Sequence, residues 1–131
     1  MTGILRTAVA TVATVLVMMV GQPSTQGHQE TERYIPIDRS PGISGKQSYI
    51  GTIQAYDPTQ RTVTVKGEAE PVTVSITERT RIWLDLSKIK KSNRAGETSA
   101  LQVGRRTEVK FENLDRRQFA DWIKVEILQS E

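Results

Sequence analysis

Apolar and polar residues alternate with a period of two through the middle of the chain. Three runs rich in β-branched residues, at 48–56, 62–66 and 72–76, are separated by clusters of turn residues at 57–60 and 67–71. This pattern predicts short antiparallel strands joined as a meander. A shared buried face fixes the register of each strand. The side chains expected to point inward are Val63, Val65, Val72, Val74 and Ile76.

The same alternation returns in the second half of the chain. Residues 81–84 are extended, an irregular basic stretch occupies 86–100, and alternation resumes over 107–111 and 119–128. The period of two then assigns alternate residues to the two faces of each strand. The residues expected to face the core are Ile123, Val125 and Ile127. The charged residues expected to face solvent are Glu108, Glu112, Lys124 and Glu126.

These elements amount to five or six strands in about eighty residues. A single open sheet of this size would leave two unpaired edges, and closure into a barrel removes them. A longer connection between the third and fourth of five strands is the layout of an OB-fold. The sequence therefore predicts an all-β fold, a small five- to six-stranded OB-like barrel, over residues 48–131.

The N-terminus has the composition of an export signal. Thirteen uncharged residues at 8–20 follow Arg6, and small and polar residues come next. The run is shorter than the ~20 residues of a transmembrane helix. We expect residues 1–27 to be a signal peptide cleaved after Gly27, with an uncleaved membrane anchor as the alternative. Residues 28–47 contain several prolines and glycines and are expected to form a flexible linker. The predicted location is periplasmic or secreted.

The amino-acid composition excludes several kinds of catalytic site. The 131 residues contain no cysteine and a single histidine, His28, so thiol nucleophiles, disulfides and multi-histidine metal centres are excluded. Acidic residues such as Asp57 and Asp115 stand in turns, where local hydrogen bonding favours aspartate. We expect no catalytic residues, no cofactor and no metal site, and the chain is not predicted to be an enzyme.

Five short motifs in the barrel region carry a resemblance to a known family. They are GTIQAYD at 51–57, VTV at 72–74, TRI at 80–82, LQVG at 101–104 and VKF at 109–111. Ala120, followed by Ile123 and Val125, continues the pattern. Together they resemble an uncharacterised bacterial family of small exported OB-like domains. The resemblance covers residues 49–128 and implies the fold and export, without a known activity.

A second resemblance concerns copper. The opening strand and turn are similar to those of periplasmic OB-fold copper chaperones, which bind Cu(I) through a histidine, two methionines and a nearby tryptophan. Here the three methionines lie within the predicted signal and no histidine lies in the barrel, so the soft ligands are missing. His28 would chelate Cu(II) only if cleavage made it the first or third residue, and a solvated linker histidine is the preferred interpretation.

The candidate partner surface combines two tryptophans with a basic loop. Trp83 and Trp122 alternate with apolar residues and share faces with charged ones, which predicts either a joint binding surface or half-buried packing. The basic residues of the loop are Lys88, Lys90, Lys91 and Arg94. We expect a non-enzymatic binding or structural module of the cell envelope, its partner an envelope protein or an anionic ligand. Membrane contact is expected only if the N-terminal segment stays uncleaved.

Polyanion or oligonucleotide binding by the OB surface and the loop at 88–94 is the alternative. The net charge is 18 − 15 = +3, a weak excess for a nucleic-acid-binding domain. Bases stack on aromatic side chains in OB-fold nucleic-acid sites. The outward residues of the second and third strands include no aromatic: Thr62, Thr64, Lys66, Thr73, Ser75 and Thr77. Nucleic acid is therefore not the expected partner.

Overall fold

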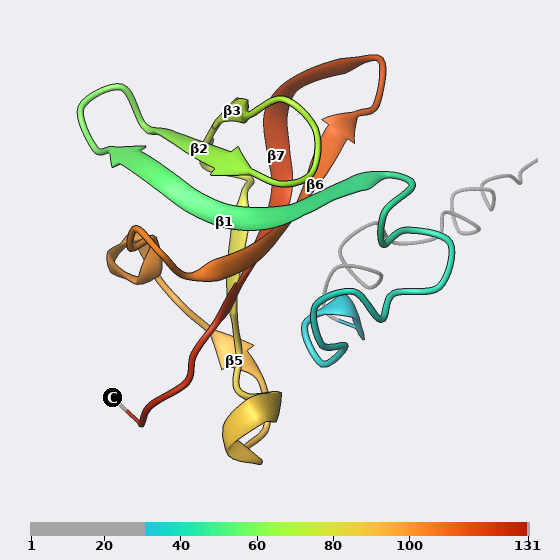
Figure 1. Cartoon of the computed structure of the whole chain (residues 1–131), viewed down its shortest axis with the longest axis vertical. Coiled ribbons are helices and arrows are strands. Elements are labelled where there is room, and N and C mark those ends of the chain that lie inside the picture. The colour runs from blue at the N-terminus through green and yellow to red at the C-terminus, as the bar shows by residue number, and fades with distance from the viewer. Residues whose placement is uncertain (1–30, 131) are drawn as a thin grey trace, which may run out of the picture.

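Seven strands and two short 3-10 helices make up most of the folded chain. The computed structural model describes residues 31–130 (Figure 1). The predicted signal segment at 1–27 and His28 lie outside these residues. The strands are β1 Ser48–Asp57, β2 Thr62–Lys66, β3 Val72–Ser75, β4 Arg81–Asp85, β5 Arg94–Ala95, β6 Arg106–Asn113 and β7 Arg116–Glu126. The 3-10 helices are η2 Ser87–Ile89 and η3 Thr98–Ala100.

Five of the strands close into a barrel. The sheet order is β3-β2-β1-β6-β7-β4-β5, and a parallel pairing of Ser75 in β3 with Phe119 in β7 completes the ring. The ring order β1-β2-β3-β7-β6 has the OB-like layout predicted from the sequence. Strand β4 runs parallel to the second half of β7, and β5 pairs with β4 outside the ring. The all-β, OB-like fold class is confirmed.

Strand β1 takes part in both halves of the barrel because it coils sharply. Its first half pairs with β6 and its second half with β2, with a register shift between Ile53 and Ala55. Gly51 lies where the two halves meet, and a Cβ atom there would lie 2.4 Å from the carbonyl oxygen of Lys66. The glycine therefore permits a close approach of two backbones that a side chain would prevent.

The predicted inward residues form the core. Val63, Val65, Val74 and Ile76 are buried, and Val72 is partly buried against the same cluster. Ile123, Val125 and Ile127 of the last strand and its extension are also buried. The barrel interior thus follows the alternation of the sequence, because each strand has one face turned to the shared core.

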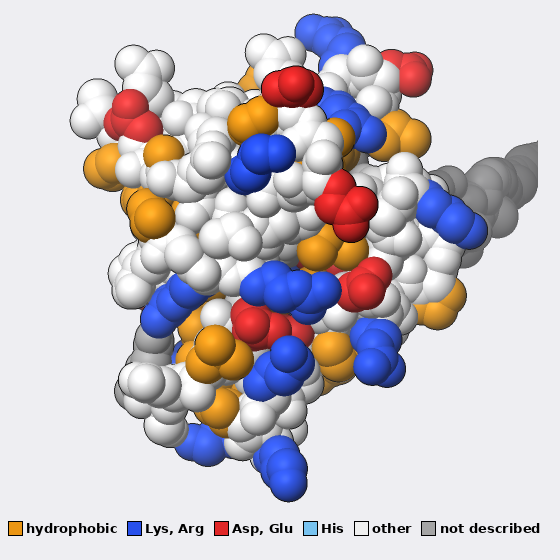
Figure 2. Space-filling model, in the orientation of Figure 1, with side chains coloured by type: hydrophobic (Ala, Val, Ile, Leu, Met, Phe, Trp, Pro, Cys, Tyr) orange, Lys and Arg blue, Asp and Glu red, His pale blue; other side chains and the backbone are white. Residues whose placement is uncertain are grey.

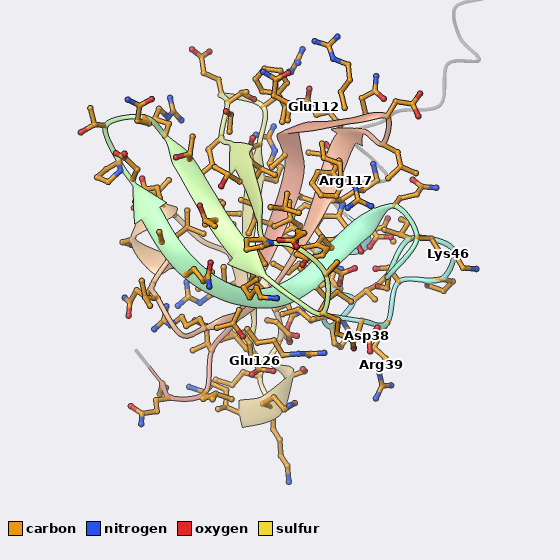
Figure 3. All side chains as sticks on the ribbon, turned by 45° about the horizontal axis from the view of Figure 1, so that its top comes forward. Asp38, Arg39, Lys46, Glu112, Arg117 and Glu126 are labelled. Carbon is orange, nitrogen blue, oxygen red and sulfur yellow. The ribbon has the colours of Figure 1, made fainter. Side chains whose placement is uncertain are left out.

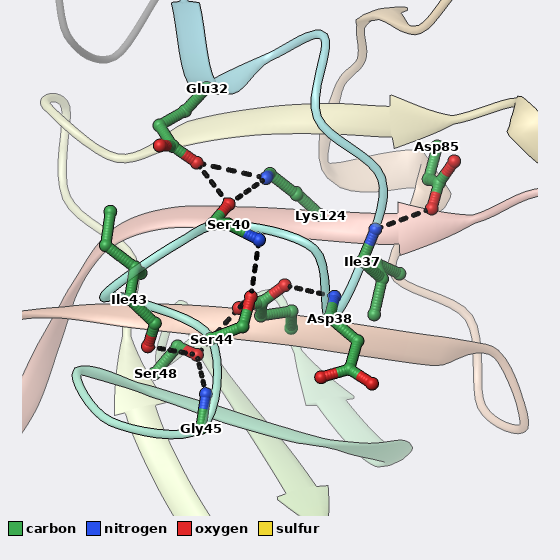
Figure 4. A network of polar contacts seen from close by, with 11 residues as sticks. Glu32, Ile37, Asp38, Ser40, Ile43, Ser44, Gly45, Ser48, Asp85 and Lys124 are labelled. Atoms are coloured by element: carbon green, nitrogen blue, oxygen red, sulfur yellow. Dashed lines mark hydrogen bonds and ion pairs between the residues drawn. The ribbon is translucent and has the colours of Figure 1, made fainter.

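The segment before the barrel is packed against it. Of the predicted flexible linker, residues 31–47 are described, and we call this segment the strap. Ile37 and Ser40 of the strap are buried, and its main chain and side chains bond to β4, β6 and β7 (Figures 1 and 4). For this part the linker prediction is wrong. Proline and glycine form turns here that fold onto the sheet, instead of leaving the segment free.

Candidate functional site

The strap lies over a polar face of the sheet. This face, called the covered face below, is formed by neighbouring residues of β4, β6 and β7: Trp83, Asp85, Glu108, Trp122, Lys124 and Glu126. The register places Lys124 between Glu108 on β6 and Trp83 on β4. Glu108 and Lys124 have no exposed surface, and Glu126 is 7% exposed. The prediction that these three face solvent is wrong, because the strap lies against Glu108 and Lys124, and the side chains of Lys88 and Arg106 lie against Glu126.

The two tryptophans lie beside one another on the covered face. Their ring centroids are 5.7 Å apart and the ring planes are tilted by 35°. Trp83 is 4% exposed and Trp122 is 1% exposed. The rings therefore adjoin, but as buried side chains they offer little surface to a partner in this structure. Both pack within the molecule and are more deeply buried than the half-buried packing that the sequence predicted.

Lys124 connects the tryptophans to the strap. Its ammonium group lies 4.4 Å from the centroid of the Trp122 ring, in cation–π geometry. It also lies 3.3 Å from Oε1 of Glu32 and 3.2 Å from the hydroxyl oxygen of Ser40. Burial lowers the pKa of Lys124, and the negative charges of Glu32, Glu108 and Asp85 oppose that shift.

The carboxylates of the covered face accept hydrogen bonds from the strap (Figure 4). Glu108 accepts from the backbone N–H of Asp38 at 2.9 Å and from the hydroxyl of Ser44 at 2.7 Å; it also accepts from the hydroxyl of Ser48, the first residue of β1, at 2.7 Å. Asp85 accepts from the backbone N–H of Ile37 at 2.9 Å. These bonds replace the water that both carboxylates lose on burial.

The contact between Ser40 and Lys124 brings a hydroxyl close to an amine. The Ser40 hydroxyl donates to Glu32, and the Lys124 ammonium donates to the Ser40 oxygen. An activated serine needs a nearby base that accepts its proton. Here the lysine is a donor and the proton points to a carboxylate that is already paired. This geometry serves to hold the strap in place.

A second feature, the basic end, adjoins the covered face. We use this name for Lys88, Lys90, Lys91, Arg94 and Arg106. The first four are exposed on η2, β5 and the loop between them, and basic side chains gather toward this end of the molecule (Figure 2). Lys88 pairs with Glu126 at 3.4 Å, and Lys91 donates to the hydroxyl of Ser130 at 2.7 Å. Lys90 and Arg94 form no ion pair with any residue from 31 to 130.

A groove separates the strap from the basic end. A cavity of about 490 Å³ lies there, and its walls are Pro36, Ile37, Asp38, Arg39, Asp85, Ser87, Lys88, Arg106 and Glu126. A second cavity, of about 430 Å³, shares Arg106 and Glu126 with the first. Figure 3 shows Asp38, Arg39 and Glu126 at this end, with Glu112 and Arg117 at the other. No sequence pattern predicts this groove, because its walls come from four separate stretches of chain.

The six predicted partner residues thus divide into two groups. Trp83 and Trp122 are buried on the covered face, whereas Lys88, Lys90, Lys91 and Arg94 are exposed. The roles of Glu32, Ser40 and Lys124 were not predicted from the sequence. A useful signal was present, since two tryptophans and a Glu–Lys cross-strand pair on one supposedly solvated face indicate that something covers it.

Among residues 31–130, no group of three or more histidine, aspartate or glutamate side chains is arranged to hold a metal ion. Within the same range, no helix has the length and apolar character needed to cross a membrane. Comparison with models of known families, with curated proteins and with solved structures found no match. The resemblance to an uncharacterised family of exported barrels therefore stays a prediction.

Proposed function

We propose that this chain is an exported, non-enzymatic binding module of the cell envelope that recognises an anionic partner through its basic end. The observation that carries the proposal is the exposure of Lys90 and Arg94, which extend from the barrel without an ion pair to any described residue. No carboxylate among the described residues neutralises these two cations, so both are available to an anionic partner. The apolar run at 8–20 supports export.

The groove supports the choice of this end. Lys88 and Arg106 stand at its wall, and both lie within ion-pair distance of Glu126. These pairs are partly exposed and therefore contribute little to folding stability. An acidic group on a partner would bind to the unpaired cations first, and the Debye length of ~8 Å in physiological salt limits this attraction to close approach.

The outer surface of the barrel argues against a base-stacking nucleic-acid site. Thr64 and Thr73 face one another across β2 and β3, with their hydroxyl oxygens 2.8 Å apart. No aromatic residue stands among the outward positions of these two strands. Oligonucleotide binding through the basic loop remains the alternative.

The test compares two charge-reversal variants on immobilised heparin, a sulfated polyanion. Lys90→Glu/Arg94→Glu removes the unpaired cations, and Lys46→Glu/Arg116→Glu reverses two exposed cations elsewhere, so both variants have the same net charge. We expect wild-type protein and the control to elute at similar salt concentration and the first variant to elute much earlier. Equal losses in both variants would contradict a localised site.

Two further probes then separate classes of partner. Vesicles containing anionic phospholipid and a single-stranded oligonucleotide are each titrated into the wild-type protein. The proposal expects weak, salt-sensitive binding to both, since neither presents a matched surface. Binding to the oligonucleotide that exceeds binding to heparin at equal salt would favour the alternative function.

A further inference from the structure

The covered face has the chemistry of a recognition surface. The strap reaches it through one carboxylate, the backbone N–H groups of Ile37 and Asp38, and hydroxyl groups. Only two strap residues, Ile37 and Ser40, are buried. The attachment is thus mainly polar and directional, unlike the apolar contacts inside the barrel.

Structural packing alone does not require such a face. A buried ion pair is often no more stabilising than apolar side chains of the same volume. Here Lys124, Glu108 and Asp85 are all buried outside the core, beside two adjoining tryptophans. Tryptophan and a desolvated, matched charge are typical of the centres of binding interfaces.

The strap is also separable from the barrel. Among the described residues, every backbone–backbone hydrogen bond made by residues 32–46 of the strap is internal to it. Only the carbonyl of Gln47, at its end, accepts from a strand, at Phe111. The strap could leave the covered face without breaking any ladder of the closed ring.

We propose that the covered face is a binding site for a loop of a partner protein, and that the strap occupies this site within the same chain. The partner loop carries a carboxylate for Lys124, in the place of Glu32. It also presents two successive backbone N–H groups to Asp85 and Glu108, and a small apolar side chain in the place of Ile37. This site is distinct from the basic end, so the proposal does not rest on the proposed function.

The strap competes with any such loop. A segment tethered next to its site has an effective concentration of about millimolar, so the wild-type chain should bind a free loop poorly. Weakening the strap should open the site. The variant Glu32→Ala/Ile37→Ala removes the carboxylate and the apolar contact and leaves every residue of the covered face unchanged.

The experiment adds a synthetic peptide of residues 31–47 to the full-length chain. Trp83 and Trp122 are the only tryptophans in the sequence and the peptide has none, so their fluorescence reports the covered face alone. We expect the strap-weakened variant to show red-shifted emission that the peptide reverses in a saturable way. Wild-type protein should bind the peptide at least about tenfold more weakly.

A matched peptide tests the chemistry. The same peptide with Glu32→Gln keeps the length and shape and loses the charge, and we expect it to bind the weakened variant about tenfold more weakly than the original peptide. Equal binding of the two peptides would overturn the role of the carboxylate. Wild-type emission together with no peptide binding would overturn the site itself.

Hydrogen exchange on the wild-type protein covers the case in which the variant fails to fold. The amides of Ile37 and Asp38 bond to side chains of the covered face, whereas that of Ile123 belongs to the barrel ladder. We expect the strap amides to exchange at least about tenfold faster, through an opening that leaves the barrel intact. Equal protection of strap and ladder would make the strap a fixed structural layer and would overturn the proposal.

Discussion

Lys124 shows how one residue can depend on a distant segment. Its side chain has no exposed surface, yet its ammonium group meets Glu32 at 3.3 Å, 92 positions earlier in the chain. An unpaired buried ammonium is costly enough to change protonation or unfold its surroundings. The strap is what makes a lysine tolerable at this position.

The lowered pKa of Lys124 predicts a pH dependence of stability. Between that lowered pKa and the ordinary lysine value of 10.5, the unfolded chain binds more protons than the folded chain. The contribution of this group to the free energy of unfolding therefore rises with pH through that window, by up to ~1.4 kcal/mol per pH unit. Below the window the penalty of burying the charge is fully present.

Urea denaturation of wild-type protein and Lys124→Met at several pH values from 7 to about 10 tests this dependence. Subtracting the variant removes the titration of all other groups. The difference, wild type minus variant, should increase as the pH is raised. A difference that stays constant over this range would show that the pKa of Lys124 is not lowered by burial.

Among the described residues, Trp122 is the largest fully buried side chain. We therefore expect its ring to contribute to folding stability. Trp122→Ala should lower the free energy of unfolding by ~3–5 kcal/mol, the usual cost of removing a large buried aromatic. Leu128→Ala is the control, because Leu128 is 63% exposed and should change stability by less than ~0.5 kcal/mol. Thermal melts of both variants decide the point, and an unchanged melting temperature for Trp122→Ala would indicate an exposed ring.

At the scale of elements, β1 and β7 each pair with different neighbours in their first and second halves. Strand β1 pairs with β6 and then with β2, and strand β7 pairs with β3 at Phe119 and with β4 from Trp122 onward. A long strand that crosses from one side of a small closed barrel to the other must bend, and in β1 a glycine and a register shift lie at the bend. Closure of the ring thus depends on Gly51 and on the bulge that follows it.

Replacing Gly51 should therefore damage the whole barrel. The Cβ of Gly51→Ala would meet a backbone carbonyl at 2.4 Å, and backbone atoms cannot move aside like a flexible side chain. We expect a loss of about 1–3 kcal/mol or more in urea unfolding. Thr52→Ala, at the exposed neighbouring position, should be nearly neutral. Equal stability of the two variants would mean that β1 does not approach β2 so closely.

At the scale of the whole molecule, one small core carries the fold, and the strap covers part of its outer wall. Strap and barrel are consecutive in sequence, so residues 31–130 form one folded unit with the predicted signal segment before it. Export would deliver this unit to the envelope with the strap close to its new N-terminus.

Intact mass spectrometry of protein from the envelope fraction tests the predicted cleavage. The apolar run at 8–20 and the small residues Thr25 and Gly27 lead us to expect a mature chain that begins at residue 28. Protein from the cytoplasm serves as the uncleaved reference. A full-length mass in washed membranes would instead identify the N-terminal segment as an anchor.

The sequence by itself determined the barrel. Alternation at Val63, Val74 and Val125 assigned the inward face correctly, because each strand buries one face against a single core and a period of two encodes that choice locally. Glycine and proline between the runs set the turns. The basic loop at 88–94 was likewise predictable as an exposed surface, since long charged side chains avoid burial without a partner.

Only the tertiary structure determined whether the outward face of the barrel wall is exposed to solvent or covered. Local alternation shows that Lys124 and Glu108 point away from the core, but it cannot show that another part of the chain lies over them. The strap attaches through single contacts, such as Ile37 to Asp85 and Glu32 to Lys124, between residues far apart in sequence. These contacts follow no sequence period and no local motif. They form only when the closed barrel brings three strands together beneath the strap, so the local pattern of any one segment cannot predict them.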